Sequence, residues 1–176
     1  AIKEETGLPV IGLVKVQYPG YVGFITPTMK EVDDLVAAGS DIVALDCTLR
    51  KRGDGSTVNE FIAQIREKYP DIILMADISN YEEGINAWKC GVDIVGTTMS
   101  GYTAYTSSVS DGPDYELMER LSRDINIPVI GEGRIHYPDQ AVKALQTGAW
   151  AIVVGGAITR PLEIAMRFQN AIKESR

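Results

Sequence analysis

Residues 37–46 read AAGSDIVALD: the end of a helix, a glycine, a short turn and then a buried strand. The same order returns in KCGVDIVGTT at 89–98 and in QTGAWAIVVGG at 146–156. A glycine after the last turn is a common helix stop, and an apolar run without alternation is typical of a strand buried on both faces. The repeat therefore predicts strands that alternate with helices, which indicates a parallel sheet with helical crossovers.

Six such units follow one another along the chain. Helix-start signals support them, among them Thr28 with Glu31 three residues later, Asn80 before an acidic turn, and Pro138 in a first turn. The predicted strands are 9–15, 41–47, 72–78, 93–99, 128–132 and 151–155. The predicted helices lie near 28–38, 57–69, 80–90, 114–125, 138–147 and 161–174.

Polar residues recur where the predicted strands end. They are Lys15, Asp46, Asp77, Thr97, Thr98, Glu132 and, after the last strand, Arg160. A TIM (β/α)8 barrel collects its active site at this edge, and no glycine-rich dinucleotide fingerprint follows the first strand, so a barrel is favoured over an open doubly wound sheet. A complete barrel has eight units and about 250 residues. AIKEETG at the start resembles the tail of a helix. We therefore expect one barrel domain over 1–176 that lacks its N-terminal strands.

Composition narrows the function classes. The chain has 176 residues with 45% apolar and 23% charged residues, as in an ordinary globular protein, and a formal charge of −7 that disfavours nucleic acid as a partner. No apolar run approaches the ~20 residues that span a bilayer, so no membrane association is expected. Cys47 and Cys90 form neither a disulfide framework nor a metal-ligand spacing, which favours the cytoplasm.

The run GEGRIHYP, residues 131–138, places Glu132 between two glycines at a strand end. A buried charge is costly unless it is paired, so such a glutamate faces either a cavity or a cation. One interpretation is a functional carboxylate beside backbone that approaches a ligand closely, through Gly133. The other is a structural salt bridge with Arg134, and the residues alone weigh the two about equally.

The run VVGGAITRP, residues 153–161, ends the last strand with Gly155 and Gly156 and places Arg160 before a proline. Backbone N–H groups and a guanidinium together favour an anion, and barrels frequently hold a phosphate in the loops after their last two strands. The alternative is a tight glycine turn with a solvated arginine.

Two further strand ends leave a choice open. Lys15 is either a catalytic amine, acting as a base or a Schiff-base nucleophile, or a lysine that covers the barrel rim. Asp77 is either a hydrogen-bonded strand end or a substrate ligand. The loop 99–114, rich in serine, threonine and tyrosine, either covers a hydroxylated ligand or is a variable surface loop. His136 is read as structural or exposed, because it has no ligand partner nearby in sequence.

Long strings at the strand ends resemble one family. They are GLVK with ITPT, DIVALDCTLRKRGDG, MADIS, GTTMSGYT, PVIGEGRIHYPDQA and VVGGAITRP. Together, in this order and over the whole chain, they resemble the N-acetylmannosamine-6-phosphate 2-epimerases. The resemblance implies a TIM barrel of sialic acid breakdown that interconverts N-acetylmannosamine 6-phosphate and N-acetylglucosamine 6-phosphate. It also implies no metal or nucleotide cofactor, and a homodimer.

The resemblance assigns residues as well. It implies Lys15 of GLVK and Glu132 of GEGRI as the catalytic pair. It implies substrate contacts from Asp77, Gly133, Gly155, Gly156 and Arg160, with Arg160 on the phosphate. The family's first-strand glutamine and second-strand arginine are not in this chain, which agrees with the expected lack of those strands.

The chemistry of C2 inversion suits these residues. The hypothesis is that Lys15, as a neutral amine, takes and returns the C2 proton, while Glu132 assists proton movement and the bound phosphate orients C2. The alternatives are a Schiff-base aldolase with Lys15 as nucleophile, another phosphosugar isomerase, and a sugar-phosphate sensor without catalysis.

Overall fold

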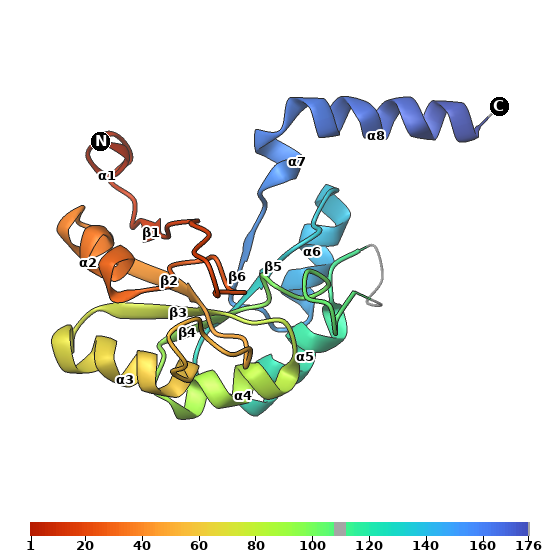
Figure 1. The fold of residues 1–176 in the computed structure, drawn as a ribbon. Helices are drawn as coiled ribbons and strands as arrows, with labels where there is room; N and C mark the ends of the chain where they lie inside the picture. Colours follow the sequence, from red (N-terminus) through yellow and green to blue (C-terminus); the bar gives the residue numbers. More distant parts are fainter. Residues whose placement is uncertain (108–111, 176) are drawn as a thin grey trace.

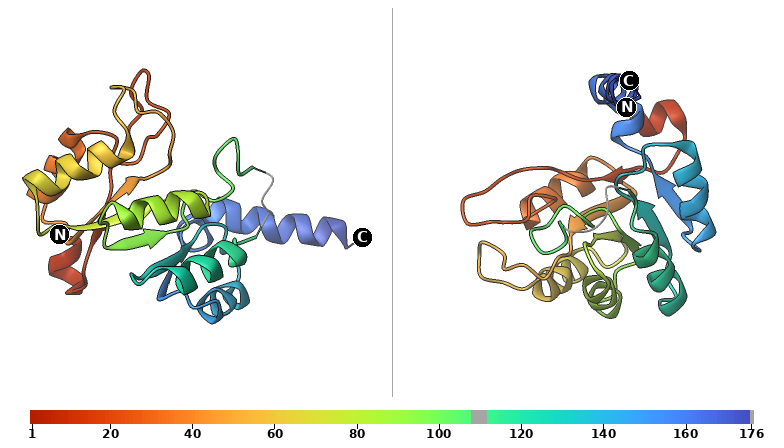
Figure 2. Two further views of the ribbon diagram at one scale, coloured as in Figure 1. Left: turned by 90° about the horizontal axis from the view of Figure 1, so that it is seen from below. Right: turned by 90° about the vertical axis from the view of Figure 1, so that its right-hand side faces the viewer.

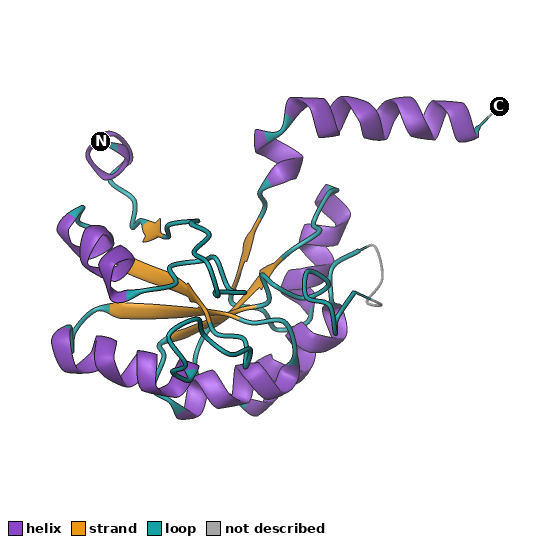
Figure 3. Ribbon diagram, viewed as in Figure 1, coloured by secondary structure: helices purple, strands orange, loops and turns teal. Residues whose placement is uncertain are grey.

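The computed structural model describes residues 1–107 and 112–175, and its centre is a parallel sheet in the order β1-β2-β3-β4-β5-β6 (Figure 1). The strands are β1 (Ile11–Gly12), β2 (Ile42–Asp46), β3 (Ile73–Asp77), β4 (Ile94–Gly96), β5 (Val129–Glu132) and β6 (Ala151–Val153). Spatial order equals chain order, so every connection is a crossover to the next strand. The sheet curls into an open half-barrel (Figure 3).

The helices follow the predicted alternation. They are α1 (Ile2–Thr6), α2 (Met29–Ala37), α3 (Val58–Lys68), α4 (Tyr81–Lys89), α5 (Tyr115–Asp124), α6 (Pro138–Gln146), α7 (Gly156–Thr159) and α8 (Pro161–Glu174). Helices α3 to α6 cover the convex face of the sheet (Figure 2, left). The main core fills the layer between them, where Leu45 and Leu74 of the strands meet Ile62 and Leu121 of the helices.

Local signals in the sequence explain where these helices begin. Thr28 with Glu31 forms a capping box at α2, and Thr57 with Glu60 forms one at α3. At α4 the side chain of Asn80 accepts the N–H of Glu83. Because these caps satisfy backbone donors that a helix start leaves free, short helices start where the sequence predicted.

The repeated segment has the same structure in each copy. Gly39, Gly91 and Gly148 follow α2, α4 and α6 with φ of 79°, 85° and 96°, a left-handed conformation that suits glycine. Two copies also share an aspartate that binds the neighbouring unit: Asp41 accepts the N–H of Val10, and Asp93 accepts the N–H of Leu74. The predicted repeat is thus a structural unit that both ends a helix and fixes the next strand.

The first strand differs from its prediction. Strand 9–15 was expected, but β1 ends at Gly12, and the chain then enters a hairpin in which Lys15 bridges Ile25 in antiparallel fashion. Buried Thr26, with φ of 46°, closes the hairpin: its hydroxyl donates to Ala44 O and accepts the N–H of Val14. Beyond Gly12, where the pairing of β1 with β2 ends, Ile25 and Thr26 therefore lie between Val14 and β2, and Ile25 O accepts the N–H of Asp46.

The inner face of the sheet follows the two-residue period of a strand. Ala44, Met75 and Ile130 pack together on this face as a second, smaller core. Two residues beyond them the chain reaches Asp46, Asp77 and Glu132, respectively. The concave face therefore changes from apolar to acidic at the carboxyl ends of the strands, where barrels place their ligands.

Helices α7 and α8 leave the sheet. Helix α8 projects away from the sheet and from the helices that cover it (Figure 1). Its large apolar side chains Leu162, Met166, Phe168 and Ile172 are each at least half exposed. Within the described ranges, no helix combines the length and apolarity needed to cross a membrane.

Candidate functional site

A cavity of about 480 Å³ opens at the carboxyl ends of the strands. Its walls come from the β1 hairpin and the segments after β4, β5 and β6. The lining residues include six that the sequence predicted, namely Lys15, Glu132, Gly133, Gly155, Gly156 and Arg160. Residues that are more than a hundred positions apart in the sequence thus meet in one wall, as expected for a barrel mouth.

Glu132 is fixed by its backbone and half-buried at the end of β5. The hydroxyl of Thr97 donates to Glu132 O at 2.8 Å and accepts the Glu132 N–H at 3.0 Å. Burial raises the pKa of the Glu132 carboxyl, while the hydroxyl of Thr98 and the charge of Lys15 act in the opposite direction. Among the described residues no cation lies within 4 Å of this carboxylate, so the structural salt bridge with Arg134 is not formed.

Arg134 turns elsewhere. Its φ is 58°, and its guanidinium lies so close to Gly101 that a Cβ there would stand 2.7 Å from Arg134 Cζ. Arg134 therefore packs against the loop after β4 while it also lines the cavity.

Asp77 lies behind the cavity wall at the end of β3. Its side chain is only 1% exposed, and Oδ1 is 2.7 Å from the hydroxyl of Thr98. Burial, with the charge of Glu132, raises the pKa of Asp77 to about 8. Oδ2 is buried and has no hydrogen-bond partner within the described part of the chain. The predicted sugar contact of Asp77 therefore stays a prediction that requires ligand to reach this oxygen.

Lys15 lines the cavity from the hairpin. Burial raises the pKa of both Glu132 and Asp77, and the charge of Lys15 lowers each of them by a smaller amount. Its backbone is held by the bridge to Ile25 rather than by the sheet. Lysine and carboxyls therefore form one electrostatic unit at the strand ends.

Arg160 stands where α7 meets α8, and its side chain is 64% exposed. Its Nη1 donates to Glu163 Oε1 at 2.8 Å, and both side chains line the cavity. A Cβ at Gly156 would lie 3.2 Å from Glu163 Oε2, so glycine leaves room for this pair. An anion bound at Arg160 would compete with the Glu163 carboxylate.

Sequence reasoning missed other cavity residues. His136 was interpreted as structural or exposed, yet it lines the cavity with Tyr102 and Phe24. Its Nδ1 is buried and, among the described residues, has no hydrogen-bond partner, and burial lowers its pKa. The only sequence signal for His136 is its place in the loop after a predicted strand, because such loops line the ligand site of a barrel. Cys47, by contrast, is fully buried in the main core.

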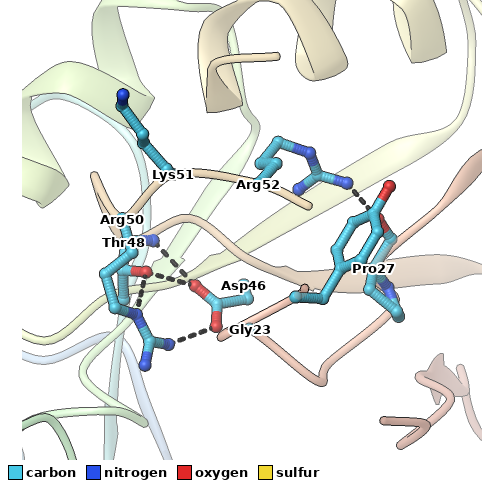
Figure 4. A pocket seen from close by; sticks show the side chains of 8 residues that line it. Gly23, Pro27, Asp46, Thr48, Arg50, Lys51 and Arg52 are labelled. Carbon is cyan, nitrogen blue, oxygen red and sulfur yellow. Dashed lines mark hydrogen bonds and ion pairs between the residues drawn. The ribbon is translucent and has the colours of Figure 1, made fainter. Parts of the chain in front are cut away.

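Asp46, the strand end beside Asp77, has a structural role (Figure 4). Its carboxylate accepts hydrogen bonds from Thr48 and forms an ion pair with Arg50 at 2.6 Å, next to a cavity of only about 20 Å³. Nearby, Arg52 stacks on the Phe61 ring at 3.7 Å and donates to Pro27 O. These groups tie the β2 loop to the hairpin. The described residues contain no group of three or more histidine, cysteine, aspartate or glutamate side chains placed to hold a metal ion.

Comparison with known proteins agrees with this architecture. The family model described as "Putative N-acetylmannosamine-6-phosphate epimerase" matches residues 1–174. A relative from Caldanaerobacter subterraneus, named "Putative N-acetylmannosamine-6-phosphate 2-epimerase", is 58% identical over all of this chain and 74% of its own length. One from Clostridium perfringens with the same name is 50% identical over 98% of this chain and 76% of its own length.

Solved structures agree as well. The N-acetylmannosamine-6-phosphate 2-epimerase from Clostridium perfringens superposes with a TM-score of 0.89 at 49% identity, covering 97% of this chain and 73% of its own. A thiamine phosphate pyrophosphorylase from Pyrococcus furiosus superposes with a TM-score of 0.55 at 26% identity, over 72% of this chain and 55% of its own. The six units are therefore those of a TIM barrel, as predicted. The chain belongs to the N-acetylmannosamine-6-phosphate 2-epimerase family.

Proposed function

We propose that the cavity interconverts N-acetylmannosamine 6-phosphate and N-acetylglucosamine 6-phosphate by moving the proton on C2. The main observation is that the amine of Lys15, the half-buried carboxyl of Glu132 and the guanidinium of Arg160 line one cavity, next to glycines whose backbone a ligand can approach. Lys15 and Glu132 supply proton transfer, and Arg160 with Gly133, Gly155 and Gly156 receives the phosphate. Membership of the family supports this substrate pair.

The open-chain sugar carries an aldehyde at C1, which makes the C2 proton removable. Lys15 takes that proton onto Nζ, the C2–H electron pair moves into an enolate, and Glu132 exchanges a proton with the oxygen on C1. Once the enolate has turned its other face toward Nζ, Lys15 returns a proton to C2 and Glu132 takes back the proton on the C1 oxygen, which gives the epimer and restores both residues. Asp77 Oδ2, buried and without a partner among the described residues, is the oxygen that would accept a sugar hydroxyl.

The direct test is turnover in D₂O, followed by NMR of the phosphosugar. Epimerisation by this route brings solvent deuterium to C2 of both sugars. Covalent trapping of substrate at Lys15 by borohydride would instead support the Schiff-base aldolase. Substrate binding without any exchange at C2 would support a sensor.

We predict that Arg160→Ala raises KM for N-acetylmannosamine 6-phosphate by about 10- to 100-fold, since a hydrogen bond to a charged group contributes about 1.5–3 kcal/mol. The value of kcat changes less, because the guanidinium does not touch C2. Steady-state kinetics measure both values. Lys173→Ala, which removes an exposed cation from the last turn of α8, is the matched control. Equal KM values for Arg160→Ala and wild type would place the phosphate elsewhere.

We also propose that the chain acts as a homodimer in which a second copy covers α8. Phe168 and Leu162 are 69% and 74% exposed, and an apolar helix face of this kind is unusual on a monomer. We predict that Phe168→Glu shifts the sedimentation coefficient from dimer to monomer, whereas Lys173→Glu, which changes the charge of the same helix by two units rather than one, does not. A monomer in the wild type at all concentrations would contradict this.

We further propose a cytoplasmic location and no nucleic acid among the partners. A cytoplasmic location is supported by two free cysteines, one of them buried. Absence of nucleic acid among the partners is supported by the charge of −7.

A further inference from the structure

One hydroxyl lies between the carboxyls of buried Asp77 and half-buried Glu132. Thr98 Oγ1 is 2.7 Å from Asp77 Oδ1 and 3.1 Å from Glu132 Oε2. A hydroxyl has one proton, so it can donate to only one of the two carboxylates. With both carboxyls ionised, the other contact would bring two oxygens together without a proton between them. With one proton on the pair, both contacts become hydrogen bonds, because the protonated carboxyl donates to Thr98 and Thr98 donates to the other carboxylate.

The surrounding backbone holds this arrangement. Thr98 follows β4 and lies between Thr97, which fixes the backbone of Glu132, and Met99, whose N–H donates to Ile78 O at 3.0 Å. Gly96 leaves the necessary space: a Cβ there would stand 3.1 Å from Thr98 Oγ1, 3.5 Å from Asp77 Oδ1, and in overlap with Met75 Cε. The ends of three neighbouring strands therefore bring these groups together, because Asp77 and Glu132 are the last residues of β3 and β5 and Thr98 lies two residues after β4.

We propose that Thr98 is a positioning residue that joins Asp77 and Glu132 into one carboxyl pair holding a single proton. The pair has two forms. In one, Asp77 is the acid and Glu132 a carboxylate; in the other, Asp77 is the carboxylate and Glu132 the acid. They interconvert when the proton of one carboxyl moves to Thr98 Oγ1 while the hydroxyl proton moves to the other carboxyl, with no change in net charge.

Because of this pairing, Glu132 can act as a proton donor and as a proton acceptor at the same pH. A reversible C2 inversion needs a group that accepts a proton near C1 in one half of the reaction and donates one in the other. Asp77, 1% exposed, then acts as the reserve for that proton without touching the reacting carbon. This last step rests on the proposed function, whereas the shared proton does not.

Other charged groups act on the pair. From the hairpin, Lys15 lowers the pKa of both carboxyls, and at the end of β2, Asp46 raises that of Asp77 while it is itself paired with Arg50. The charged or titratable residues Arg134, His136, Arg160 and Glu163 line the same cavity as Glu132. Burial and the Glu132 charge are the two largest causes of the raised pKa of Asp77, which agrees with one proton on the pair near neutral pH.

The test compares Thr98→Val, which keeps the shape and removes the hydroxyl, with Thr98→Ser, which keeps the hydroxyl. Carboxyl ¹³C chemical shifts, assigned with Asp77→Asn and Glu132→Gln, are followed against pH without substrate. The hydroxyl stabilises the singly protonated pair, so it lowers the first apparent pKa and raises the second. In Thr98→Val we expect the separation between the two to shrink by about one pH unit, and in Thr98→Ser to stay as in wild type. Thr98→Ala serves if valine is not accommodated. An unchanged separation in the variant without hydroxyl would overturn the proposal.

Kinetics distinguish this proposal from the function it extends. Thr98→Val is expected to lower kcat about tenfold with little change in KM and to narrow the pH range of activity, with rescue by serine. If Thr98→Val brings the two apparent pKa values closer together but the wild type shows no turnover, the carboxyl pair is supported and the epimerase assignment is rejected. If the wild type exchanges deuterium at C2 but Thr98→Val leaves the separation of the pKa values unchanged, the epimerase assignment is supported and the carboxyl pair is rejected.

Discussion

Replacement of Lys15 by alanine is expected to lower the rate of C2–H exchange in D₂O by about 10²- to 10⁴-fold, the usual contribution of a positioned acid or base. The variant should fold normally, because the bridge between Lys15 and Ile25 is made by backbone groups and Thr26 closes the hairpin from within. Exchange is measured by NMR on N-acetylmannosamine 6-phosphate. Binding of the phosphosugar should persist, since Arg160 is untouched.

Two comparisons make this result specific. Lys51→Ala removes an exposed lysine from the small cavity at the end of β2, outside the proposed site, and should exchange at the wild-type rate. Glu132→Gln should also be slow, and the double variant should be little slower than either single one, because groups that act as a unit give non-additive losses. Wild-type exchange in Lys15→Ala would reject its role as the base, and additive losses would indicate that the two residues act independently.

Much of the architecture was predictable because it depends on sequence patterns among residues that are close together in the chain. The apolar repeats, the capping pairs such as Thr28 with Glu31, and the glycine after each repeated helix each depend on residues a few positions apart. Such signals need no knowledge of distant contacts. The convergence of Glu132 and Arg160 followed from one rule, that parallel strands of a barrel end at the same mouth.

The remainder depends on contacts across the chain. The hairpin after β1 is closed by the hydrogen bond from the Thr26 hydroxyl to Ala44 O, 18 residues away. No pattern in residues 9–15 predicts this contact. The place of Asp77 behind Thr98 depends on the register between β3 and β4, in which Asp77 lies opposite Gly96. Strand periodicity gives the face on which a side chain lies but not its neighbour on the next strand, so the carboxyl pair was not foreseen.

Replacement of Asp77 by asparagine is expected to change how stability depends on pH. The pKa of Asp77 is raised from its usual 3.8 to about 8, so between these values the folded protein holds a proton that the unfolded chain has lost. Proton binding is then greater in the folded state, and the free energy of unfolding falls as pH rises through this window, by at most about 1.4 kcal/mol per pH unit for one group. Asparagine cannot titrate, and its amide can still donate to Thr98.

The free energy of unfolding, measured by urea denaturation from pH 4 to pH 9, should therefore fall less steeply in Asp77→Asn. The variant should be more stable than wild type at pH 8, with the difference smallest near pH 4. Some slope should remain, since burial also raises the pKa of Glu132. Asp71→Asn, an exposed aspartate before β3, should give a curve parallel to wild type. Glu132→Gln should lower the pH at which Asp77 loses its proton in the folded protein, because the negative charge that helps to raise the pKa of Asp77 is removed. Curves of equal slope for Asp77→Asn and wild type would show that Asp77 is ionised in the folded protein.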